Sequence, residues 1–372
     1  MPRRQCVTLY IYMVTKCRDN PRRKWIAVLE IPTNELPRFS LRPFKWLRFL
    51  AFCVTGVQGR IALSCDVASP TVDYNTPVVT EKVKVYYHLP PGTHAQVFPI
   101  DPDLAKSSVH TERSQREGRF RDQLIIRDKS CAMSGDEDTE GLDGAHCISF
   151  SKGSEVSSSF LNVILKLCFL TVFLQYLKTY TSNRGNVVIE EINDVRNGLL
   201  VAKTLHHRVG KRTAFLPVRI HPVGRNCMRS YFIQIPNFAM EAGDVATQVR
   251  QLRPGQRVQT QDARQWIIQH FGANSSVLPL IAPHGAPLFV PAPRYISKWP
   301  PESLFCAIYG GTAMRQWLVS GFADIARKVY TDRLYPSDTQ NSRDGRRQQI
   351  KKKRRNDEKK AEQSAVRQKR RE

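Results

Sequence analysis

The sequence contains no pair of cysteines at CxxC spacing, which argues against a zinc ribbon or a zinc finger. Its cysteines are odd in number and scattered over 372 residues, a pattern typical of reduced thiols inside a cell and not of a disulfide framework. The nine cysteines are Cys6, Cys17, Cys53, Cys65, Cys131, Cys147, Cys168, Cys227 and Cys306.

A recognisable secretion signal is also missing. The stretch MPRRQCVTLYIYMVTKCRDNPRRK combines basic residues with a short apolar run, but Thr15 and Lys16 break that run and no small-residue cleavage site follows it. We therefore expect no signal peptide and an intracellular location, either nuclear or cytoplasmic.

Acidic residues are scarce compared with basic ones, at 33 Asp and Glu against 57 Lys and Arg, for a net charge of +24. A protein this basic attracts polyanions at long range; nucleic acid is the commonest, and an anionic membrane is the alternative. Apolar residues make up 41% of the chain, so it has enough of them for a folded core of one or two compact units.

The patterning predicts an α+β chain in four parts. A mixed α/β region has strand-like stretches at 25–32, 60–67 and 81–90 and a short helix at 44–53; it has no chemical motif, so we expect a scaffold or docking surface. A C-terminal accessory region has two expected helices, at 261–271 and 312–334. The expected parts are residues 1–113, 114–240, 241–335 and a basic disordered tail at 336–372.

The tail has almost no large apolar residues, so it cannot form a core. From Asn341 to Glu372 it contains 14 basic and 5 acidic residues, a net of +9. The runs KKKRR at 351–355 and RQKRR at 367–371 suit nuclear import or phosphate contact, and a purely solubilising tail is the alternative.

The central part contains three short motifs in a fixed order. A stretch from Ser114 reads as a helix ending in RD (residues 127–128), then a turn and a strand with C..SG (residues 131–135). AHCISFSKG (residues 145–153) begins as an apolar strand. NDVRNGLLVAKTLHHRVG (residues 193–210) reads as a turn followed by a helical stretch.

In this order the sequence resembles the HNH nucleases, specifically the HNH domains widespread in fungal proteins. The family pattern has a helix ending in RD, a C..(S/T)G strand, an AHI strand, and NG followed by a histidine nine residues after the asparagine. Asn197 and His206 have that offset. The resemblance is best over roughly residues 80–240 and implies a ββα-metal core.

Hydrolysis of a phosphodiester requires an activated water, charge stabilisation on the phosphate and help for the leaving 3′ oxygen. The resemblance assigns the general base to His146 on the strand, since the pKa of histidine lies near neutral pH. It makes His206 a metal ligand from the helix and gives Asn197 the task of orienting the base or the phosphate. Alone, an Asn-Gly dipeptide is an ordinary turn, and only the spacing favours His206 over the adjacent His207.

One departure concerns the metal. Many active HNH enzymes have Asp or His directly before the general base, where this chain has Ala145, as the fungal subgroup does. Asp143, two residues earlier, is our candidate for the second metal ligand beside His206. Cys131 has no partner cysteines and is expected to be a small core residue.

The longest apolar run, residues 160–177, is just long enough to span a membrane. Lys166 lies in its middle, however, and a span here would separate His146 from His206. Deleting 156–175, or 218–234, joins flanks that look like the family's continuous sequence, so we interpret both segments as insertions or translated introns. Sequencing the spliced transcript tests this.

The sequence thus predicts an endonuclease that uses a divalent metal, Mg²⁺ by preference with Mn²⁺ or Zn²⁺ as alternatives. Its expected partner is nucleic acid, with DNA favoured over RNA and no membrane association; the oligomeric state is open. The alternative from another class is an inactive HNH-derived module that binds nucleic acid through its charge.

Overall fold

The computed structural model describes residues 5–17, 20–77, 79, 81–97, 99–100, 115–148, 189, 191, 193–219, 240–245, 264–272, 281–291 and 293–326. The chain divides into two units, Met1–Arg327 and Lys328–Glu372. The apolar run, nearly all of 218–234 and the basic tail lie outside the described residues, so what was predicted for them stays a prediction. No helix within the described part is long and apolar enough to cross a membrane.

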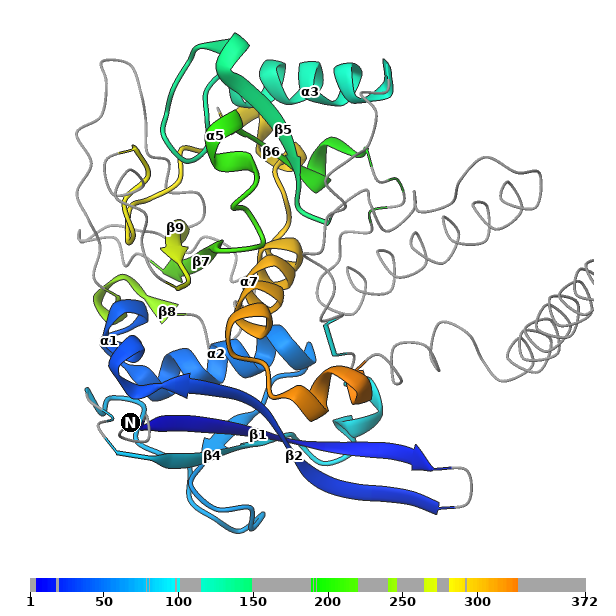
Figure 1. Ribbon diagram of the computed structural model, residues 1–372, viewed down its shortest axis with the longest axis vertical. Helices are drawn as coiled ribbons and strands as arrows, with labels where there is room; N and C mark the ends of the chain where they lie inside the picture. Colours follow the sequence, from blue (N-terminus) through cyan, green and yellow to red (C-terminus); the bar gives the residue numbers. More distant parts are fainter. Residues whose placement is uncertain are drawn as a thin grey trace, which may run out of the picture. The chain divides into compact units, whose positions relative to one another are not determined.

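The N-terminal part is built on a four-stranded sheet with the strand order β2-β1-β4-β3. The central strand β1 pairs antiparallel with β2 and parallel with β4, and β3 pairs antiparallel with β4 (Figure 1). The strands expected at 25–32 and 81–90 are confirmed, whereas the stretch at 60–67 forms only three residues of strand. The strands are β1 (Cys6–Cys17), β2 (Asn20–Pro32), β3 (Arg60–Ala62) and β4 (Val83–His88).

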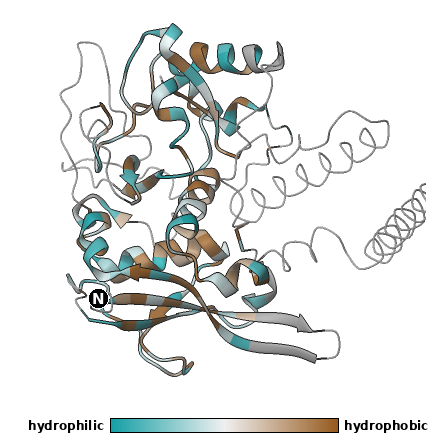
Figure 2. Ribbon diagram, viewed as in Figure 1, coloured by the Kyte–Doolittle hydropathy of each residue, from teal (hydrophilic) through white to brown (hydrophobic). Residues whose placement is uncertain are grey.

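Helices cover one face of this sheet. Helix α2 (Pro43–Thr55) confirms the helix expected at 44–53. Almost all of its side chains are buried, and its hydrophobic residues are brown in Figure 2. Helix α7 (Glu302–Trp317) packs against α2, where the indole of Trp46 donates a hydrogen bond of 2.5 Å to the Tyr309 hydroxyl. A side chain at Gly310 would meet the Cys53 backbone at 3.1 Å, so glycine allows this close approach.

The helix expected at 312–334 is wrong at its beginning and is interrupted at 318–319, and residues 327–334 lie outside the described part. Helix α7 begins ten residues earlier, at Glu302, and ends at Trp317. It ends there because Leu318 bridges to Leu29 of β2 and the Val319 amide donates to the Val28 carbonyl at 3.0 Å, which needs extended backbone. The chain is helical again at 320–326.

A second sheet has the order β8-β7-β9 and contains another correction. Residues 261–271 were expected to be helical, yet 264–270 form strand β9. Ile267 and Ile268 lie opposite Leu216 and Phe215 of β7, and this pairing outweighs the helix-like spacing of the apolar residues. The strands are β7 (Thr213–Arg219), β8 (Met240–Glu241) and β9 (Arg264–His270).

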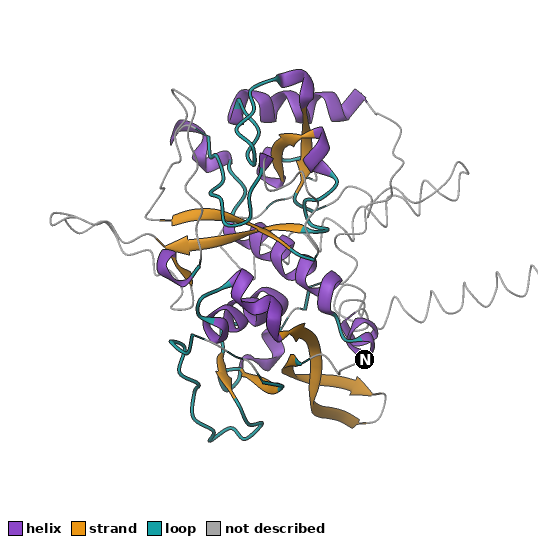
Figure 3. Cartoon of the chain, turned by 60° about the vertical axis from the view of Figure 1, so that its left-hand side comes forward, coloured by secondary structure: helices purple, strands orange, loops and turns teal. Residues whose placement is uncertain are grey.

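The third sheet has two antiparallel strands, β5 (Leu142–His146) and β6 (Gly198–Ala202), and the short helix α5 (Lys203–His206) follows β6 directly. The helical stretch expected to end at Gly210 is therefore mostly wrong, because its residues 198–202 pair with β5. Helix α3 (Gln115–Asp128) confirms the helix ending in RD and contacts both strands (Figure 3). The strand expected after it, around 131–135, is a turn.

Short helical segments complete the described structure. They are α1 (Leu36–Phe39), η1 (Thr33–Glu35), η2 (Thr93–Gln96), η3 (Thr139–Gly141), η5 (Val195–Asn197), η6 (Ala242–Asp244) and η7 (Pro293–Lys298).

Candidate active site

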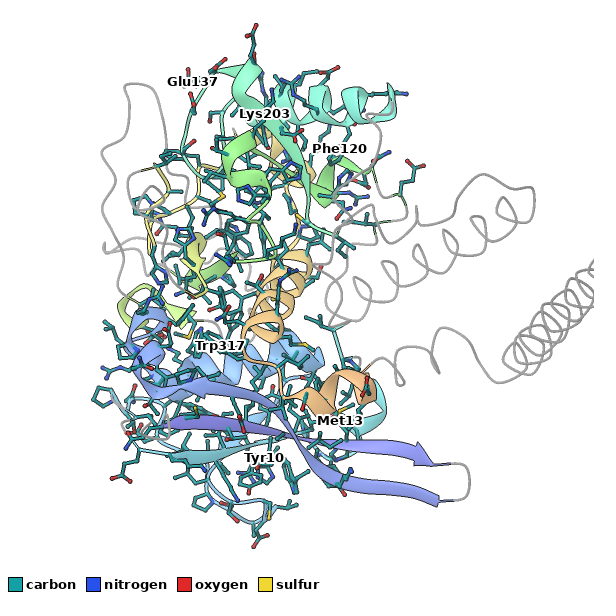
Figure 4. The ribbon with its side chains drawn as sticks, in the orientation of Figure 1. Tyr10, Met13, Phe120, Glu137, Lys203 and Trp317 are labelled. Carbon is teal, nitrogen blue, oxygen red and sulfur yellow. The ribbon has the colours of Figure 1, made fainter. Side chains whose placement is uncertain are left out.

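Two glycines allow α3 to lie directly on the β5–β6 ribbon. A Cβ atom at Gly144 would be 3.2 Å from the Phe120 ring, and one at Gly198 would overlap the Cζ atom of the same ring. Gly198 has an extended backbone, with φ of −145°, so it is not needed for a left-handed turn. The sequence NG at 197–198 is therefore explained by packing, and Phe120 (Figure 4) reaches the site because no side chain stands in its way.

The RD motif at the end of α3 is a buried clamp. The Arg127 guanidinium donates to the carbonyl oxygens of Val195 at 2.6 Å and Gly198 at 2.8 Å, one on each side of Asn197. It is also ion-paired with Asp128, whose second oxygen accepts from the Leu200 amide at 3.0 Å. Burial raises the pKa of Asp128 against the opposing effect of Arg127.

Both the oxygen and the nitrogen of the Asn197 side-chain amide form hydrogen bonds with the backbone of Ile148. Its Oδ1 accepts from the Ile148 amide at 3.0 Å and its Nδ2 donates to the Ile148 carbonyl at 3.2 Å. Its own carbonyl accepts from Cys147 at 2.7 Å. The side chain is fully buried, so Asn197 fixes the course of the chain directly after His146.

His146 is the last residue of β5, and its imidazole ring is contacted on one face by Phe120 and at Nε2 by Asn193. The ring stacks on Phe120, with centroids 4.1 Å apart and planes at 4°. Its Nε2 lies 3.1 Å from Oδ1 of Asn193, which as an amide oxygen can only accept, so Nε2 carries the proton and Nδ1 is the basic nitrogen. Burial lowers the pKa of His146 to about 4, and the hydrogen bond to Asn193 opposes this shift.

Asp143 and His206 form a hydrogen-bonded pair between β5 and α5. Oδ2 of Asp143 on β5 lies 2.6 Å from Nδ1 of His206 on α5, and both side chains are about 40% exposed. Partial burial alone would raise the pKa of Asp143, but the hydrogen bond and charge of His206 outweigh it and lower that pKa. The charges of both residues also act on His146, so the three groups share one electrostatic site.

The strand that ends in His146, the strand that begins after Asn197 and the helix that ends in His206 occur in the order that the HNH pattern requires. Residues 131–213 match the HNH endonuclease family. The chain carries an HNH endonuclease domain. No curated protein and no solved structure matches the chain.

The C..SG motif of the HNH domain forms a turn around a buried sulfur. The Cys131 Sγ atom accepts from the backbone amides of Ser134 at 3.3 Å and of Ala202, on β6, at 3.2 Å. Gly135 closes the turn with a positive φ of 73° and donates to the Cys131 carbonyl at 2.8 Å. The expectation that Cys131 is a core residue is confirmed, since it is fully buried.

The segment after α5 is strongly basic. Arg208, Lys211 and Arg212 all lower the pKa of the exposed His207 through their charge, after the effect of its partial burial. Partial burial, and then the charge of Arg315 near the end of α7, lower the pKa of Lys211. We call Arg208, Lys211, Arg212 and Arg315 the basic cluster; it places positive charge next to the helix that carries His206.

The structure brings the four sequence-predicted residues together on β5, the segment before β6, and α5. Sequence reasoning gave no role to Asn193, Phe120 or Arg127, although the RD motif and the NDVRNG stretch contain two of them. Their signal lay in those motifs, but the partners that give them meaning are about 20 to 70 residues away in the chain. No cluster of three or more His, Cys, Asp or Glu side chains suited to a metal occurs among the described residues.

Proposed function

We propose that the HNH domain is an endonuclease of the ββα-metal type, which hydrolyses phosphodiester bonds in nucleic acid with a divalent metal. The observation that carries this proposal is the electrostatic coupling of three groups. A neutral, oriented His146 ends β5, and the charges of the hydrogen-bonded pair of Asp143 and His206 act on its ring. Such a set offers a base and, within reach of its charge, two groups that can bind a metal.

In this proposal His146 takes the proton of the attacking water. With Nε2 protonated by its bond to Asn193, Nδ1 accepts that proton as the water oxygen bonds to phosphorus and the 3′ oxygen leaves. A pKa of about 4 keeps the ring neutral near pH 7, as a base must be. A bound phosphate adds negative charge next to the ring, which raises that pKa toward the useful range.

Asp143 and His206 are the residues that would hold the metal. A carboxylate and an imidazole, both partly open to solvent, suit Mg²⁺, Mn²⁺ or Zn²⁺ with the remaining positions left for water and substrate phosphate. The lowered pKa of Asp143 keeps it ionised, as a ligand must be. When bound, the metal supplies positive charge for the phosphate and the leaving oxygen.

For Asn197 we assign the first of its two expected roles, orientation of the base. Its amide is hydrogen-bonded at both ends to Ile148, two residues beyond His146. The Arg127 clamp holds the carbonyls on either side of it. Asn197 therefore acts through the backbone that carries the base.

Nucleic acid is the proposed substrate because charge favours it. The chain carries a net +24, and the basic cluster lies next to α5. We keep DNA ahead of RNA as the substrate, and a nuclear or cytoplasmic location, as proposals.

A second function, nucleic-acid binding without cleavage, has one observation in its favour. Ala145 stands where many active HNH enzymes have a metal ligand, and it is buried, which leaves Asp143 and His206 as the candidate donors among the described residues. Activity and binding must therefore be measured separately.

The experiment is nicking of a supercoiled plasmid by the purified full chain with Mg²⁺ or Mn²⁺. His146→Ala is expected to lower the rate by about 100-fold or more while plasmid binding persists, since loss of a general base costs at least that much. His207→Ala is the matched control, because it removes an exposed imidazole next to His206 and should leave the rate unchanged. Equal rates for the wild type and His146→Ala would exclude His146 as the base, and binding without any nicking would favour the second function.

A further inference from the structure

The N-terminal sheet has two faces of different character. Along β1, Leu9, Ile11 and Met13 are buried, while Tyr10 and Tyr12 alternate with them on the opposite face and are half-buried. Helices α2 and α7 use the first face, and Tyr10 lies on the side away from α2 in Figure 4. The second face is therefore the outer face of the sheet.

Four large rings form one continuous layer on that outer face. Tyr10 stacks on Tyr86 of β4 with centroids 5.0 Å apart and planes at 21°. Trp25 of β2 contacts Tyr86 edge-on at 5.2 Å and Tyr12 at 5.3 Å. The strand register explains the layer, because Tyr10 lies opposite Tyr86 and Tyr12 lies opposite Trp25. We call Tyr10, Tyr12, Trp25 and Tyr86 the aromatic layer.

The outer face of an antiparallel or mixed sheet is normally polar, so an aromatic layer there needs a reason other than the core. All four rings are partly exposed, and two histidines extend the layer at its margins, His88 against Trp25 and His94 against Tyr12. Rings in this arrangement present flat π surfaces that a nucleobase can stack on.

Positive charge lies beside the aromatic layer, on a chain with a net charge of +24. Lys84 precedes Tyr86 by two residues on β4, so it lies on the same face, and it is exposed. Lys24 is also exposed, but it directly precedes Trp25 and so lies on the opposite face of the edge strand β2. Two carboxylates of this part, Glu30 on β2 and Glu81 before β4, are exposed as well. Flat rings beside a lysine, on so basic a chain, match bases joined by phosphates better than an apolar peptide.

We infer that the aromatic layer binds the unstacked bases of a single-stranded nucleic acid. In a duplex the bases are stacked on one another and their faces are covered, so only an unpaired strand can use the rings. Binding here does not depend on the cleavage proposed above. If both hold, the substrate of the HNH domain contains a single-stranded segment, and that consequence alone rests on the proposed function.

The first test measures affinity by fluorescence anisotropy, with the full chain in EDTA so that no cleavage occurs. The probes are an oligothymidylate of about 15 nucleotides, the same length without bases, and a duplex of that length. We expect the abasic strand, which keeps every phosphate, to bind about tenfold or more weakly than the oligothymidylate. Equal affinity for both would overturn the inference, because it would mean that charge alone binds the strand.

The second test locates the contact. Tyr86→Thr keeps a strand-forming residue but removes a ring, and it should weaken oligothymidylate binding about tenfold with little effect on the duplex. Tyr295→Thr, which removes a ring outside the aromatic layer, is the matched control. Loss of single-strand and duplex binding together would instead indicate a folding or charge effect and count against the inference.

A third measurement uses the wild-type chain and needs no destabilising variant. Stacking of a base near Trp25 should quench part of the tryptophan fluorescence on addition of oligothymidylate, and Trp25→Phe should remove that quenching while keeping most of the affinity. The absence of quenching, or quenching that survives in Trp25→Phe, would place the strand elsewhere. Sedimentation tests a different occupant. If the wild type is a dimer, Tyr86→Thr is a monomer and both bind oligothymidylate equally well, the aromatic layer binds a second copy of the chain instead. Measuring the affinity for oligouridylate in the same assay shows whether the layer prefers RNA or DNA.

Discussion

The side-chain oxygen of Asn193 lies 3.1 Å from Nε2 of His146, and the Phe120 ring covers one face of the same imidazole. Together these contacts fix the plane of the ring and decide which nitrogen carries the proton. A base that is oriented in advance loses little freedom when the substrate binds. Asn193 is thus a positioning residue for the proposed base, although it lies 47 residues from it in the chain.

Replacing Asn193 should change the pKa of His146 without altering the imidazole itself. Asn193→Asp puts a carboxylate next to Nε2–H, which favours the charged imidazolium and raises the pKa of His146 from about 4. The acid limb of the kcat/KM profile should therefore move to higher pH. Asn193→Ala, which removes the acceptor, should lower kcat while that limb stays or moves to lower pH. The pH–rate profile of plasmid nicking measures both.

A merely structural role for Asn193 would give a different result. Both variants would then lose stability and activity together, with the acid limb unchanged. Asp136→Asn offers a matched control, since it makes a similar exchange of carboxylate and amide in the same domain, outside the site.

The metal prediction concerns the carboxylate of the Asp143–His206 pair. Asp143→Asn keeps the size and a hydrogen-bonding oxygen for His206 but removes the charge. If Asp143 is a ligand, cleavage by this variant should require at least about tenfold more Mn²⁺. His206→Ala should abolish the response to metal in the tested range. Calorimetric titration of Mn²⁺ in the absence of nucleic acid gives a readout that does not depend on turnover.

Wild-type metal dependence in Asp143→Asn would contradict the ligand assignment. Asp143 would then act only by orienting His206, with the Nδ1–H bond of 2.6 Å as its whole contribution.

The sequence predicted the elements whose signal is local and missed those decided by a distant partner. Helix α2 was predictable because nearly every turn is apolar and it begins at Pro43. The sequence predicts a helix in place of strand β9 because Trp266, Ile267 and Phe271 fit a helical face as well as a strand. Only β7, far away in the chain, selects the strand.

The site was predictable to the same extent. The order and spacing of His146, Asn197 and His206 predicted the family, because spacing along the chain can be recognised without knowing which residues are in contact. The reason for each residue type did not follow from spacing. Gly198 looked like half of a turn, and only the position of α3 reveals that it leaves room for Phe120. Likewise, Arg127 became a clamp only through carbonyl groups at Val195 and Gly198.

The packing of α3 on the ribbon gives a stability prediction. Gly198→Ala places a methyl group where the Phe120 ring lies, and that ring is itself stacked on His146, so overpacking should destabilise the chain by about 1–3 kcal/mol. Urea unfolding followed by circular dichroism measures this. Because Phe120 also covers His146, nicking should fall more than the loss of folded protein explains.

Two further variants make this test specific. Gly243→Ala is the matched control, since nothing lies within 4 Å of a Cβ atom there, and its stability should be unchanged. In the double variant Phe120→Leu with Gly198→Ala, the smaller side chain should recover part of the loss. Additive losses in the double variant would mean that the clash with Phe120 is not the cause.

Outside the HNH site, the buried His270 and the half-buried His284 form a neutral pair between β9 and α1. His284 Nδ1 accepts from the His270 amide at 3.1 Å and its Nε2 donates to the Arg38 carbonyl at 2.6 Å. His270 accepts at Nδ1 from the Thr213 hydroxyl and donates from Nε2 to the Ala282 carbonyl at 2.7 Å. Every ring nitrogen is thus used by a neutral tautomer. Protonation of His284 would break its bond from the His270 amide, because a backbone N–H can only donate.

This pair should make folding sensitive to acid. Burial, with the nearby His270 and Arg38, lowers the pKa of His284 from 6.5 to about 4 in the folded chain. At a pH between these two pKa values, His284 is protonated in the unfolded chain but not in the folded chain. The stabilisation is therefore complete above pH 6.5 and declines as the pH falls toward 4, by at most about 1.4 kcal/mol per pH unit.

His284→Gln, which can accept and donate without titrating, should give a shallower fall in unfolding free energy between about pH 7 and pH 5. Some slope should persist, because burial lowers the pKa of His270 and His146 too. The same slope in both proteins would show that His284 does not couple folding to pH.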